Sequence, residues 1–460
     1  MLLKPMILPF PPIFEIRMRA AAQPEWEEFA LAHRAEPPVS IRLNRSKNNS
    51  HIEDAVPWTA LGKYLNERSV FTLDPTFHAG AYYVQEASSM FLEQAVRQSV
   101  DLSQPLRVLD LCAAPGGKST HLLSMISTDS LLVANEVIRS RATTLSENIQ
   151  KWGHPNVVVT NNDPEDFQRL TGFFDLIVVD APCSGEGLFR KDPMAMEEWS
   201  PENVALCAQR QRRILSDVWP ALKENGVLIY CTCTYNEEEN EDNLIWLGQQ
   251  NNSECVELEI KDAWGVQPAK KGNVTGYRFF PNRLKGEGFF IAALRKTREE
   301  VPARTKSKFS FASPPAKTIE QLREWVRDSS RFQFVIQDDL ILMIPLANVP
   351  DVASLSERLK ILTKGTALAT LKREKLVPEH AGALSIALKG EFFAQEKVDK
   401  EHALAYLRKD NLFLGEGKRG FALAMYEDLP LGWVNLLGNR MNNLYPSSWR
   451  IRMSPKTPLK

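Results

Sequence analysis

The sequence predicts an α/β protein built around a mostly parallel, doubly wound sheet, with smaller α+β units before and after it. Between residues 106 and 294, apolar strand-like runs alternate with helix-like stretches, which is the pattern of βαβ units. A glycine pair at 116–117 follows the first of these runs and opens a helix, as expected of a ligand-binding turn in such a sheet. At 460 residues the chain is too long for one hydrophobic core, so further units must flank the sheet.

Six apolar runs are expected to form the strands of this sheet. They are "LRVLDLC", "SLLVANEV", "NVVVTNND", "FDLIVVDAP", "GVLIYCTCTY" and "GFFIAAL". In open α/β sheets, ligands bind outside the carboxyl ends of the strands. The residues that follow each run are therefore the candidates for a functional site.

Four units are expected along the chain: 1–95, 96–297, 298–375 and 376–460. The first contains helix-like "EWEEFALAHRA" and extended "VSIRLN", the second the sheet. The stretch "TREEVPARTKSKFSFASPPAK" near 297–317 is polar, basic and rich in proline, so it is read as a linker. The remainder is mixed α+β and is divided near residue 375.

Composition argues for a reduced protein of the cytoplasm. No apolar run approaches the roughly 18–20 residues of a membrane span, and prolines interrupt the N-terminal segment, so neither a signal peptide nor a membrane segment is expected. All six cysteines fall in the central part of the chain, where they could not staple every unit with disulfides. They are Cys112, Cys183, Cys207, Cys231, Cys233 and Cys255.

Charge is unevenly distributed along the chain. The net charge is −1, but residues 301–460 hold 25 Lys and Arg against 17 Asp and Glu, a local charge of +8. A basic half on a near-neutral chain indicates a polyanionic partner, although a solvated surface explains such a bias equally well.

The stretch "LDLCAAPGGKST" (109–120) predicts a turn that binds a nucleotide-like cofactor. It has neither the G-x-G-x-x-G of dinucleotide sites nor the spacing of a Walker loop. Glu136 ends the next strand, where a carboxylate can accept both ribose hydroxyls of an adenosine. Asp163 and Asp180 end the third and fourth strands. Carboxylates without a phosphate clamp suit S-adenosylmethionine, and the alternative is a structural turn with unrelated surface acids.

Two cysteines follow strands of the sheet, Cys183 in "DAPCSG" and Cys233 in "YCTCTY". Such a thiol can be packing, a metal ligand or a nucleophile. No metal site is expected, because "CTC" lacks the usual C-x₂₋₄-C spacing and no histidine pair follows. Cys231 lies on the same side of an extended strand as Cys233, so one of the two is open to a packing role.

Nucleophilic use of a thiol has a specific rationale beside a methyl donor. Carbon 5 of cytosine accepts a methyl group only after a thiolate has added to carbon 6. A base must then remove the hydrogen of carbon 5 so that the thiol can leave. "DAPC" also differs from the [DN]-P-P-[YF] sequence of amino-group methyltransferases. Two cysteines at strand ends therefore favour methylation of a pyrimidine carbon.

The ordered motifs resemble those of RNA cytosine-5 methyltransferases of the Sun/Nop type, in particular the bacterial RsmF-like branch that acts on 16S ribosomal RNA. They are "LCAAPGGKSTHL", "VANE", "DAPCSGEGLFRKDP", "QRRIL", "YCTCTYNEEENE" and "YRFFPNRLKGEGFF". The resemblance is strongest over residues 80–295 and extends to "LPLGWVNLLGNRMNNLYPSSWRI", which is similar to a PUA-like tail. It implies a class I, Rossmann-like methyltransferase domain with RNA-binding units on both sides.

The resemblance also implies roles for individual residues. Cys233 of the Thr-Cys pair would be the nucleophile, Cys183 of the Pro-Cys pair would assist product release, and Asp180 would hold the amino edge of a flipped cytosine. The cofactor contacts it implies are Cys112, Ala113, Ala114, Pro115, Gly116, Gly117, Lys118, Glu136, Arg141, Asp163 and Asp180. The chain departs from many relatives at Asn282, where they have histidine, so Asn282 is given no part in proton transfer.

The expected partner is RNA, with 16S ribosomal RNA or the small ribosomal subunit ahead of transfer RNA. Arg190 and Lys191, after the Pro-Cys pair, are candidates for phosphate contacts. Arg210, Arg212 and Arg213 are read as a solvated helix face. The rival of a different class is an RNA-binding or assembly factor without turnover, which would need neither cysteine. A monomer is expected.

Overall fold

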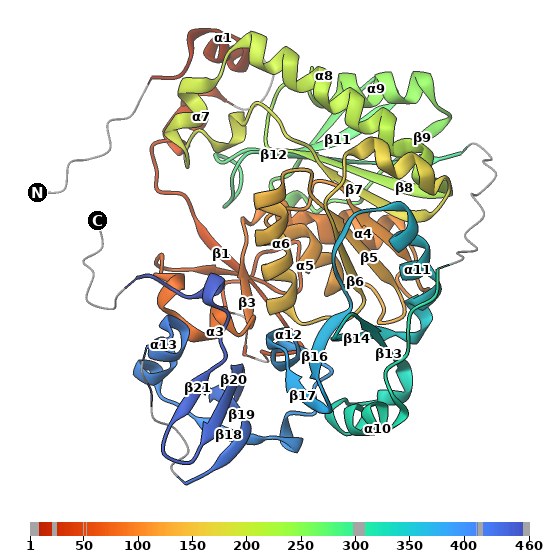
Figure 1. Cartoon of the computed structure of the whole chain (residues 1–460). Helices are drawn as coiled ribbons and strands as arrows, with labels where there is room; N and C mark the ends of the chain where they lie inside the picture. The colour runs from red at the N-terminus through yellow and green to blue at the C-terminus, as the bar shows by residue number, and fades with distance from the viewer. Residues whose placement is uncertain are drawn as a thin grey trace, which may run out of the picture.

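The computed structural model describes residues 9–20, 25–48, 50–51, 53–297, 309–410, 412 and 417–453. A large twisted sheet with helices on both faces forms the centre of the molecule (Figure 1). Part of the predicted linker, residues 298–308, lies outside the described residues. Among the described residues no helix combines the length and the apolar composition that crossing a bilayer requires.

The described part of the central sheet has ten strands in the order β10-β11-β12-β8-β7-β4-β5-β6-β15, with β9 paired to β12. Neighbours among β4, β5, β6, β7 and β8 are parallel, while β12 runs antiparallel to β8. All six predicted runs form strands of this sheet, which confirms the fold class. Its strands are β4 (Arg107–Asp110), β5 (Leu131–Asn135), β6 (Val157–Thr160), β7 (Phe174–Asp180), β8 (Leu222–Thr232), β9 (Ser253–Val256), β10 (Gln267–Lys271), β11 (Val274–Phe279), β12 (Phe289–Lys296) and β15 (Ile361–Lys364).

Two hydrophobic cores lie on opposite faces of the sheet, as a doubly wound fold requires. One buries side chains of α4 (Leu92–Ser99), α5 (Gly117–Leu123) and α6 (Arg139–Trp152). The other buries side chains of α8 (Pro201–Val218), α9 (Glu241–Gln250) and α11 (Val349–Arg358). The loops between strands and helices therefore gather at the carboxyl edge of the parallel strands.

The N-terminal unit consists of a small antiparallel sheet and short helices that pack against the central domain. Its strands have the order β2-β1-β3. Phe14 and Phe29 of its first two helices join a cluster with Phe189, Tyr235 and Phe280 from loops of the central domain. The elements are α1 (Pro12–Ala20), α2 (Trp26–Ala32), α3 (Pro75–His78), α7 (Pro193–Glu198, from the central domain), β1 (Val39–Leu43), β2 (Gly62–Leu65) and β3 (Tyr82–Val84).

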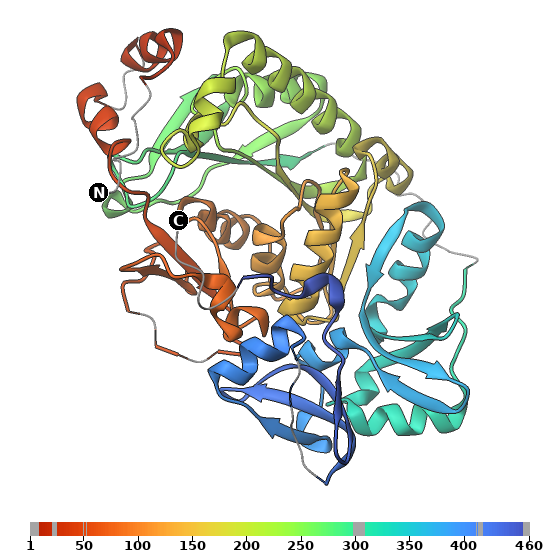
Figure 2. The ribbon, with the colours of Figure 1, turned by 60° about the vertical axis from the view of Figure 1, so that its left-hand side comes forward.

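Two further sheets follow, in the orders β13-β14-β16-β17 and β18-β19-β20-β21. Figure 2 shows the last sheet beside the N-terminal unit, where Ala79 shares a core with Leu404 and Val434. β15 extends the central sheet, so the region after the linker is tied into the central domain. The elements are α10 (Ala316–Trp325), α12 (His380–Leu384), α13 (Lys400–Arg408), β13 (Phe332–Gln337), β14 (Leu340–Pro345), β16 (Thr366–Lys372), β17 (Lys375–Pro378), β18 (Ala394–Lys397), β19 (Arg419–Tyr426), β20 (Leu429–Leu437) and β21 (Met441–Asn443).

Candidate active site

The glycine turn follows β4 and leads directly into α5. Gly116 has a φ of +113°, and a Cβ there would meet the side chain of Leu145 at 3.3 Å, so both backbone and space favour glycine. Asp110, at the end of β4, is fully buried beneath the turn and accepts a hydrogen bond from the hydroxyl of Ser119 at 2.6 Å. Burial raises the pKa of Asp110 to about 7, although the bond from Ser119 opposes the rise.

Glu136 follows β5 and links this strand end to the glycine turn. Its side chain is buried and accepts a hydrogen bond from the backbone N–H of Ile138 at 2.9 Å. The guanidinium of Arg141 lies 3.4 Å from the Glu136 carboxylate and donates to the carbonyl of Ala114 at 2.9 Å. Val137 and Ile138, both about half exposed, form an apolar edge beside the carboxylate.

Asp163 and Asp180 continue the row of carboxylates along the sheet edge. Asp163 accepts a hydrogen bond from the N–H of Glu165 and forms an ion pair with Arg213 of α8. Asp180 ends β7 and forms an ion pair with Lys118 of the glycine turn, with Nζ and Oδ2 2.7 Å apart. The third and fourth strand ends are thus connected to α8 and to the glycine turn.

A cavity of about 480 Å³ opens at this edge of the sheet, which is within the range of ligand sites in proteins. It brings together most of the predicted site residues, namely Cys112, Ala114, Glu136, Arg141, Asp163, Asp180, Cys183 and Cys233. Ala113, Pro115, Gly116, Gly117 and Lys118 are not among the residues that line it. The lining also includes Asn135, Val137, Ile138 and Arg210, which sequence reasoning did not assign to the cofactor. Val137 and Ile138 could have been predicted from the sequence, because they are apolar and directly follow Glu136.

The two strand-end thiols meet inside this cavity. The Sγ atoms of Cys183 and Cys233 lie 3.0 Å apart. The contact with Cys233, together with burial, holds the pKa of Cys183 well above its usual range. Cys231 is fully buried in the sheet opposite Ile291, so it packs the strand while Cys233, just past the strand, reaches the cavity.

The arginines predicted near the site divide into two groups. Arg190 is not available to a phosphate, because its guanidinium is buried against Glu287 at 3.0 Å and also donates to the carbonyl of Gly286. That prediction is wrong, since a buried carboxylate compensates the charge inside the protein. Lys191 is exposed. Arg212 donates to Asn243. Arg210 and Arg213 are both exposed and line the cavity, where Arg213 forms its ion pair with Asp163.

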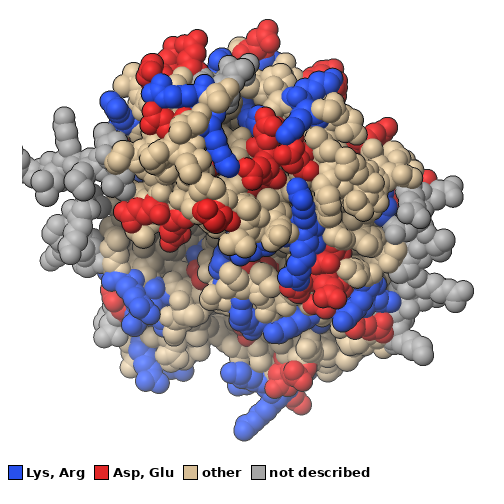
Figure 3. Space-filling model, turned by 90° about the horizontal axis from the view of Figure 1, so that it is seen from above, with Lys and Arg blue, Asp and Glu red and all other residues tan. Residues whose placement is uncertain are grey.

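Charge on the face around α8 is mixed. In Figure 3, which looks down on the top of the view in Figure 1, basic and acidic side chains are interspersed. This face therefore does not present a field of one sign. Among the described residues there is also no cluster of three or more His, Cys, Asp or Glu side chains that could hold a metal ion.

Comparison with known proteins assigns the chain to a family. Residues 98–295 match the family described as 16S rRNA methyltransferase RsmB/F. Residues 10–87 match the N-terminal domain of 16S rRNA methyltransferase RsmF, and residues 396–451 match the methyltransferase RsmF PUA domain. Ribosomal RNA small subunit methyltransferase F of Escherichia coli is 30% identical over 473 residues, which cover 95% of this chain and 96% of that protein. The chain belongs to the RsmF family of 16S rRNA methyltransferases.

A second relative carries the same name, and two solved structures share the fold. The methyltransferase F of Shigella dysenteriae is 29% identical over 480 residues, covering 95% of this chain and 96% of that protein. The crystal structure of a methyltransferase homolog from Pyrococcus horikoshii superposes with a TM-score of 0.52 and 26% identity, over 62% of this chain and 94% of that one. NSun6 from the same organism, solved with the S-adenosylmethionine analogue SFG, shares the fold, with a TM-score of 0.53, 20% identity, and coverage of 63% and 99%.

This RsmF-family chain is an S-adenosylmethionine-dependent ribosomal RNA methyltransferase with an RNA-binding PUA domain. The cavity fits the cofactor in its chemistry. Glu136 has a buried carboxylate of the kind that accepts ribose hydroxyls, Val137 and Ile138 form an apolar edge of the kind that a base packs on, and no phosphate clamp is present in the described turn.

Proposed function

We propose that the protein methylates carbon 5 of cytosine in 16S ribosomal RNA, through a covalent bond between Cys233 Sγ and carbon 6 of a flipped base. The observation that carries this proposal is the pair of thiols 3.0 Å apart in the same cavity as the cofactor-side carboxylates. Amino-group methylation needs no thiol, and cysteine packing alone does not require two sulfur atoms in contact at a cavity wall.

Cys233 acts as the nucleophile in this proposal. Formation of the Sγ–C6 bond makes carbon 5 of the base nucleophilic. S-adenosylmethionine, when bound, supplies the methyl group. A base, for which we propose Cys183, then takes the carbon 5 hydrogen as a proton. The C5–H electron pair restores the C5=C6 double bond and the Sγ–C6 electron pair leaves on sulfur, which frees the methylated base and returns the thiolate.

Cys183 assists the release of product. The contact with Cys233 and burial hold the pKa of Cys183 well above its usual range, so Cys183 keeps its proton beside the nucleophile. Contact with Cys233 is the largest cause of that raised pKa, and this contact changes once the Cys233 sulfur is bonded to carbon 6 of the base. Deprotonation of Cys183 becomes easier at that stage, so it is placed to take part in the steps that follow methyl transfer.

Asp180 orients the base. Its carboxylate faces the cavity from the end of β7 and is held from the other side by Lys118. A carboxylate at this place can accept a hydrogen bond from the amino group of cytosine, which distinguishes cytosine from uracil. Arg210, at the rim, is a suitable contact for a phosphate of the flipped nucleotide.

The other units hold the RNA around the flipped base. We propose the division into 1–95, an accessory RNA-binding unit; 96–297, the methyltransferase domain; 298–375, a linker and middle domain; and 376–460, the PUA-like unit. A base that leaves its stack requires contacts to the flanking nucleotides, and the basic second half of the chain can supply them. The proposed state is a monomer in the cytoplasm.

Bisulfite mapping tests the substrate and the methylated atom together. Naked 16S ribosomal RNA, small subunits and bulk transfer RNA are each incubated with the protein and S-adenosylmethionine. New bisulfite-resistant cytosines in 16S ribosomal RNA or in the subunits are expected. Bisulfite-resistant cytosines in transfer RNA alone would mean that the protein performs the same chemistry on transfer RNA and not on 16S ribosomal RNA. Incorporation of methyl groups without any resistant cytosine would contradict methylation at carbon 5.

A further inference from the structure

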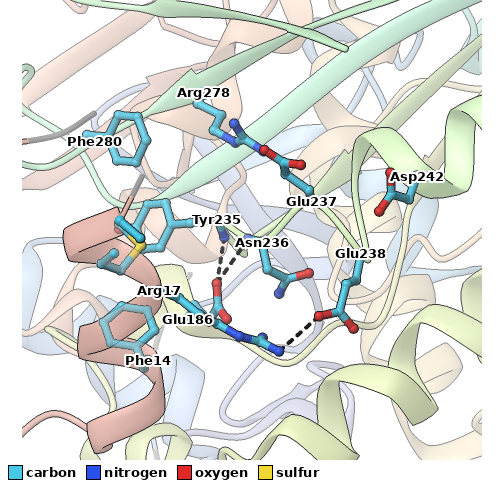
Figure 4. A pocket seen from close by; sticks show the side chains of 12 residues that line it. Phe14, Arg17, Glu186, Tyr235, Asn236, Glu237, Glu238, Asp242, Arg278 and Phe280 are labelled. Carbon is cyan, nitrogen blue, oxygen red and sulfur yellow. Dashed lines mark hydrogen bonds and ion pairs between the residues drawn. The ribbon is translucent and has the colours of Figure 1, made fainter. Parts of the chain in front are cut away.

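Two buried carboxylates connect the loops that carry the thiols. Glu186 belongs to the loop of Cys183, and its Oε2 accepts hydrogen bonds from the backbone N–H groups of Tyr235 at 3.0 Å and Asn236 at 3.1 Å. These two residues directly follow Cys233 and Thr234 in the other loop. Figure 4 shows the Glu186 carboxylate pointing to this backbone.

Glu239 makes the reciprocal connection. It belongs to the loop of Cys233, and its Oε2 accepts a hydrogen bond from the backbone N–H of Ser184, the neighbour of Cys183, at 3.0 Å. Its Oε1 accepts from the hydroxyl of the same serine. Each loop thus supplies one carboxylate to the backbone of the other, and we call Glu186 and Glu239 the carboxylate clasp.

Helix α8 and the residues just before it hold the two carboxylates of the clasp in place. Trp199 Nε1 donates to Glu186 Oε1 at 3.0 Å. Gln211 Nε2 donates to Glu239 Oε2 at 2.8 Å and to the carbonyl of Pro182 at 3.0 Å. Both carboxylates therefore have fixed orientations, and these contacts lie on both sides of the two cysteines.

The N-terminal unit supports the same loop from outside. A cavity of about 430 Å³ lies between α1 and the segment after Cys233, with Glu186 in its wall. Across it, Arg17 of α1 forms an ion pair with Glu238 at 2.9 Å (Figure 4). Tyr235 stacks on Phe280, with ring centroids 5.2 Å apart. The loop is thus held by the clasp on one side and by α1 on the other.

Burying two carboxylates is expensive compared with apolar packing. Glu186 is 1% and Glu239 0% exposed. Burial raises the pKa of Glu239 even though Asn236, Ser184 and Gln211 donate hydrogen bonds to it. Apolar side chains of similar size would pack a loop at lower free energy, but they would not fix the direction of backbone N–H groups. A network of this kind specifies one geometry.

We infer that Glu186 and Glu239 are positioning residues, which hold Cys183 and Cys233 at the separation needed for consecutive action on one base. This inference rests on the proposed function and deepens it. The backbone N–H of Gly187 also donates to the carbonyl of Cys233 at 2.9 Å, so the two loops are joined directly beside the thiols. Loss of either carboxylate frees one loop relative to the other.

The test measures the relation of the two thiols without using activity. The azo oxidant diamide accepts two electrons and two protons from a pair of adjacent thiols, which leaves a disulfide and a hydrazine. Mass spectrometry of peptides follows the Cys183–Cys233 disulfide in the full chain. Glu186→Gln and Glu239→Gln should each slow its formation by roughly tenfold or more, because an amide group now faces N–H donors.

Glu241→Gln is the matched control. Glu241 is equally buried, two residues after Glu239, but it forms its ion pair with Arg278 at 2.6 Å and bonds to neither cysteine loop. This variant should form the disulfide at the rate of the unmodified protein. In methylation assays the clasp variants should lose kcat by about the same factor as the disulfide rate, while KM for RNA and affinity for S-adenosylmethionine stay unchanged.

Wild-type disulfide rates in folded Glu186→Gln and Glu239→Gln proteins would overturn the inference. If Glu239→Gln does not fold, Ser184→Ala and Gln211→Met remove its partners one at a time and should give the same slowing. Wild-type rates in both of these variants would equally overturn it. The rate of disulfide formation is measured without RNA. It therefore tests the role of the clasp even if the protein does not methylate carbon 5 of cytosine.

Discussion

Lys118 Nζ lies 2.7 Å from Asp180 Oδ2, which joins the glycine turn of the cofactor site to the strand end that carries the proposed base contact. Burial opposes the charge on Lys118, but Asp180 and the other acidic groups around it raise the pKa of Lys118 overall. The lysine is therefore charged and oriented toward the carboxylate. It links the two halves of the site instead of lining the cavity.

Lys118→Met removes the cation and leaves Asp180 without this support. Because Asp180 is more than a third exposed, the loss of stability should be small, about 1 kcal/mol or less. The rate of methyl transfer at saturating cofactor should fall about tenfold or more, because a misplaced Asp180 no longer aligns the base. Single-turnover methylation and thermal unfolding measure the two effects. An unchanged rate would show that Asp180 needs no partner.

Glu136→Ala removes the buried carboxylate assigned to the ribose. Loss of charged hydrogen bonds should weaken binding of S-adenosylmethionine by about 1–3 kcal/mol. Isothermal titration calorimetry measures the affinity, and Glu147→Ala is the control, because Glu147 of α6 is paired with Lys151 away from the cavity. Equal affinities in the two variants would remove Glu136 from the site.

Asp110 should make stability depend on pH. The pKa of Asp110 is about 7 in the folded protein and about 3.9 in an unfolded chain. Between these two pH values the carboxyl group is therefore protonated in the folded state but ionised in the unfolded state. The stability contributed by protonated Asp110 is present in full below about pH 4 and is lost as the pH rises to about 7.

Asp110→Asn cannot ionise and retains an acceptor for Ser119. The melting temperature of the variant relative to the unmodified protein should therefore rise between pH 4.5 and pH 8, as measured by differential scanning fluorimetry. A difference that stays constant across this range would mean that Asp110 is not protonated in the folded protein.

The strand ends were predictable because they follow from period and order in the sequence. The βαβ alternation gives parallel strands, and parallel strands bring Glu136, Asp163 and Asp180 to one edge whatever the connecting helices do. The same reasoning places Cys183 and Cys233 together, since β7 and β8 are neighbours. The fold class and the cavity-lining members of the candidate site were within reach of the sequence.

The sequence does not predict which charged side chains pair with one another or become buried in the folded protein. Arg190 follows the Pro-Cys pair and looks available to RNA, yet Glu287, nearly one hundred residues later, buries it. Glu186 and Glu239 lie in acidic or glycine-rich runs that read as solvated loops. Such pairings depend on tertiary contacts between distant loops, which neither periodicity nor motif spacing encodes.

Basic side chains of the PUA domain should contribute to RNA binding through phosphates. Arg419 and Arg440 are exposed on or next to the strands of the last sheet. The double change Arg419→Gln/Arg440→Gln should raise KM for RNA and flatten its salt dependence by about 0.7 in log–log slope per lost contact. Affinity for S-adenosylmethionine should not change.

Substitution of Arg169 and Lys270 by glutamine removes the same charge from exposed positions of the central domain and serves as the control. If both double variants flatten the salt dependence equally, the effect comes from net charge and not from the PUA domain.

Trapping of a protein–RNA adduct tests the central claim most directly. Each cysteine variant is incubated with RNA and S-adenosylmethionine and analysed on a denaturing gel, with circular dichroism to verify folding. Cys183→Ala should accumulate a slowly migrating covalent complex, because attack by Cys233 proceeds while elimination stalls. Cys233→Ala and the double variant should form none and should not methylate RNA. A complex that accumulates with Cys233→Ala and is absent with Cys183→Ala would contradict the account and make Cys183 the nucleophile.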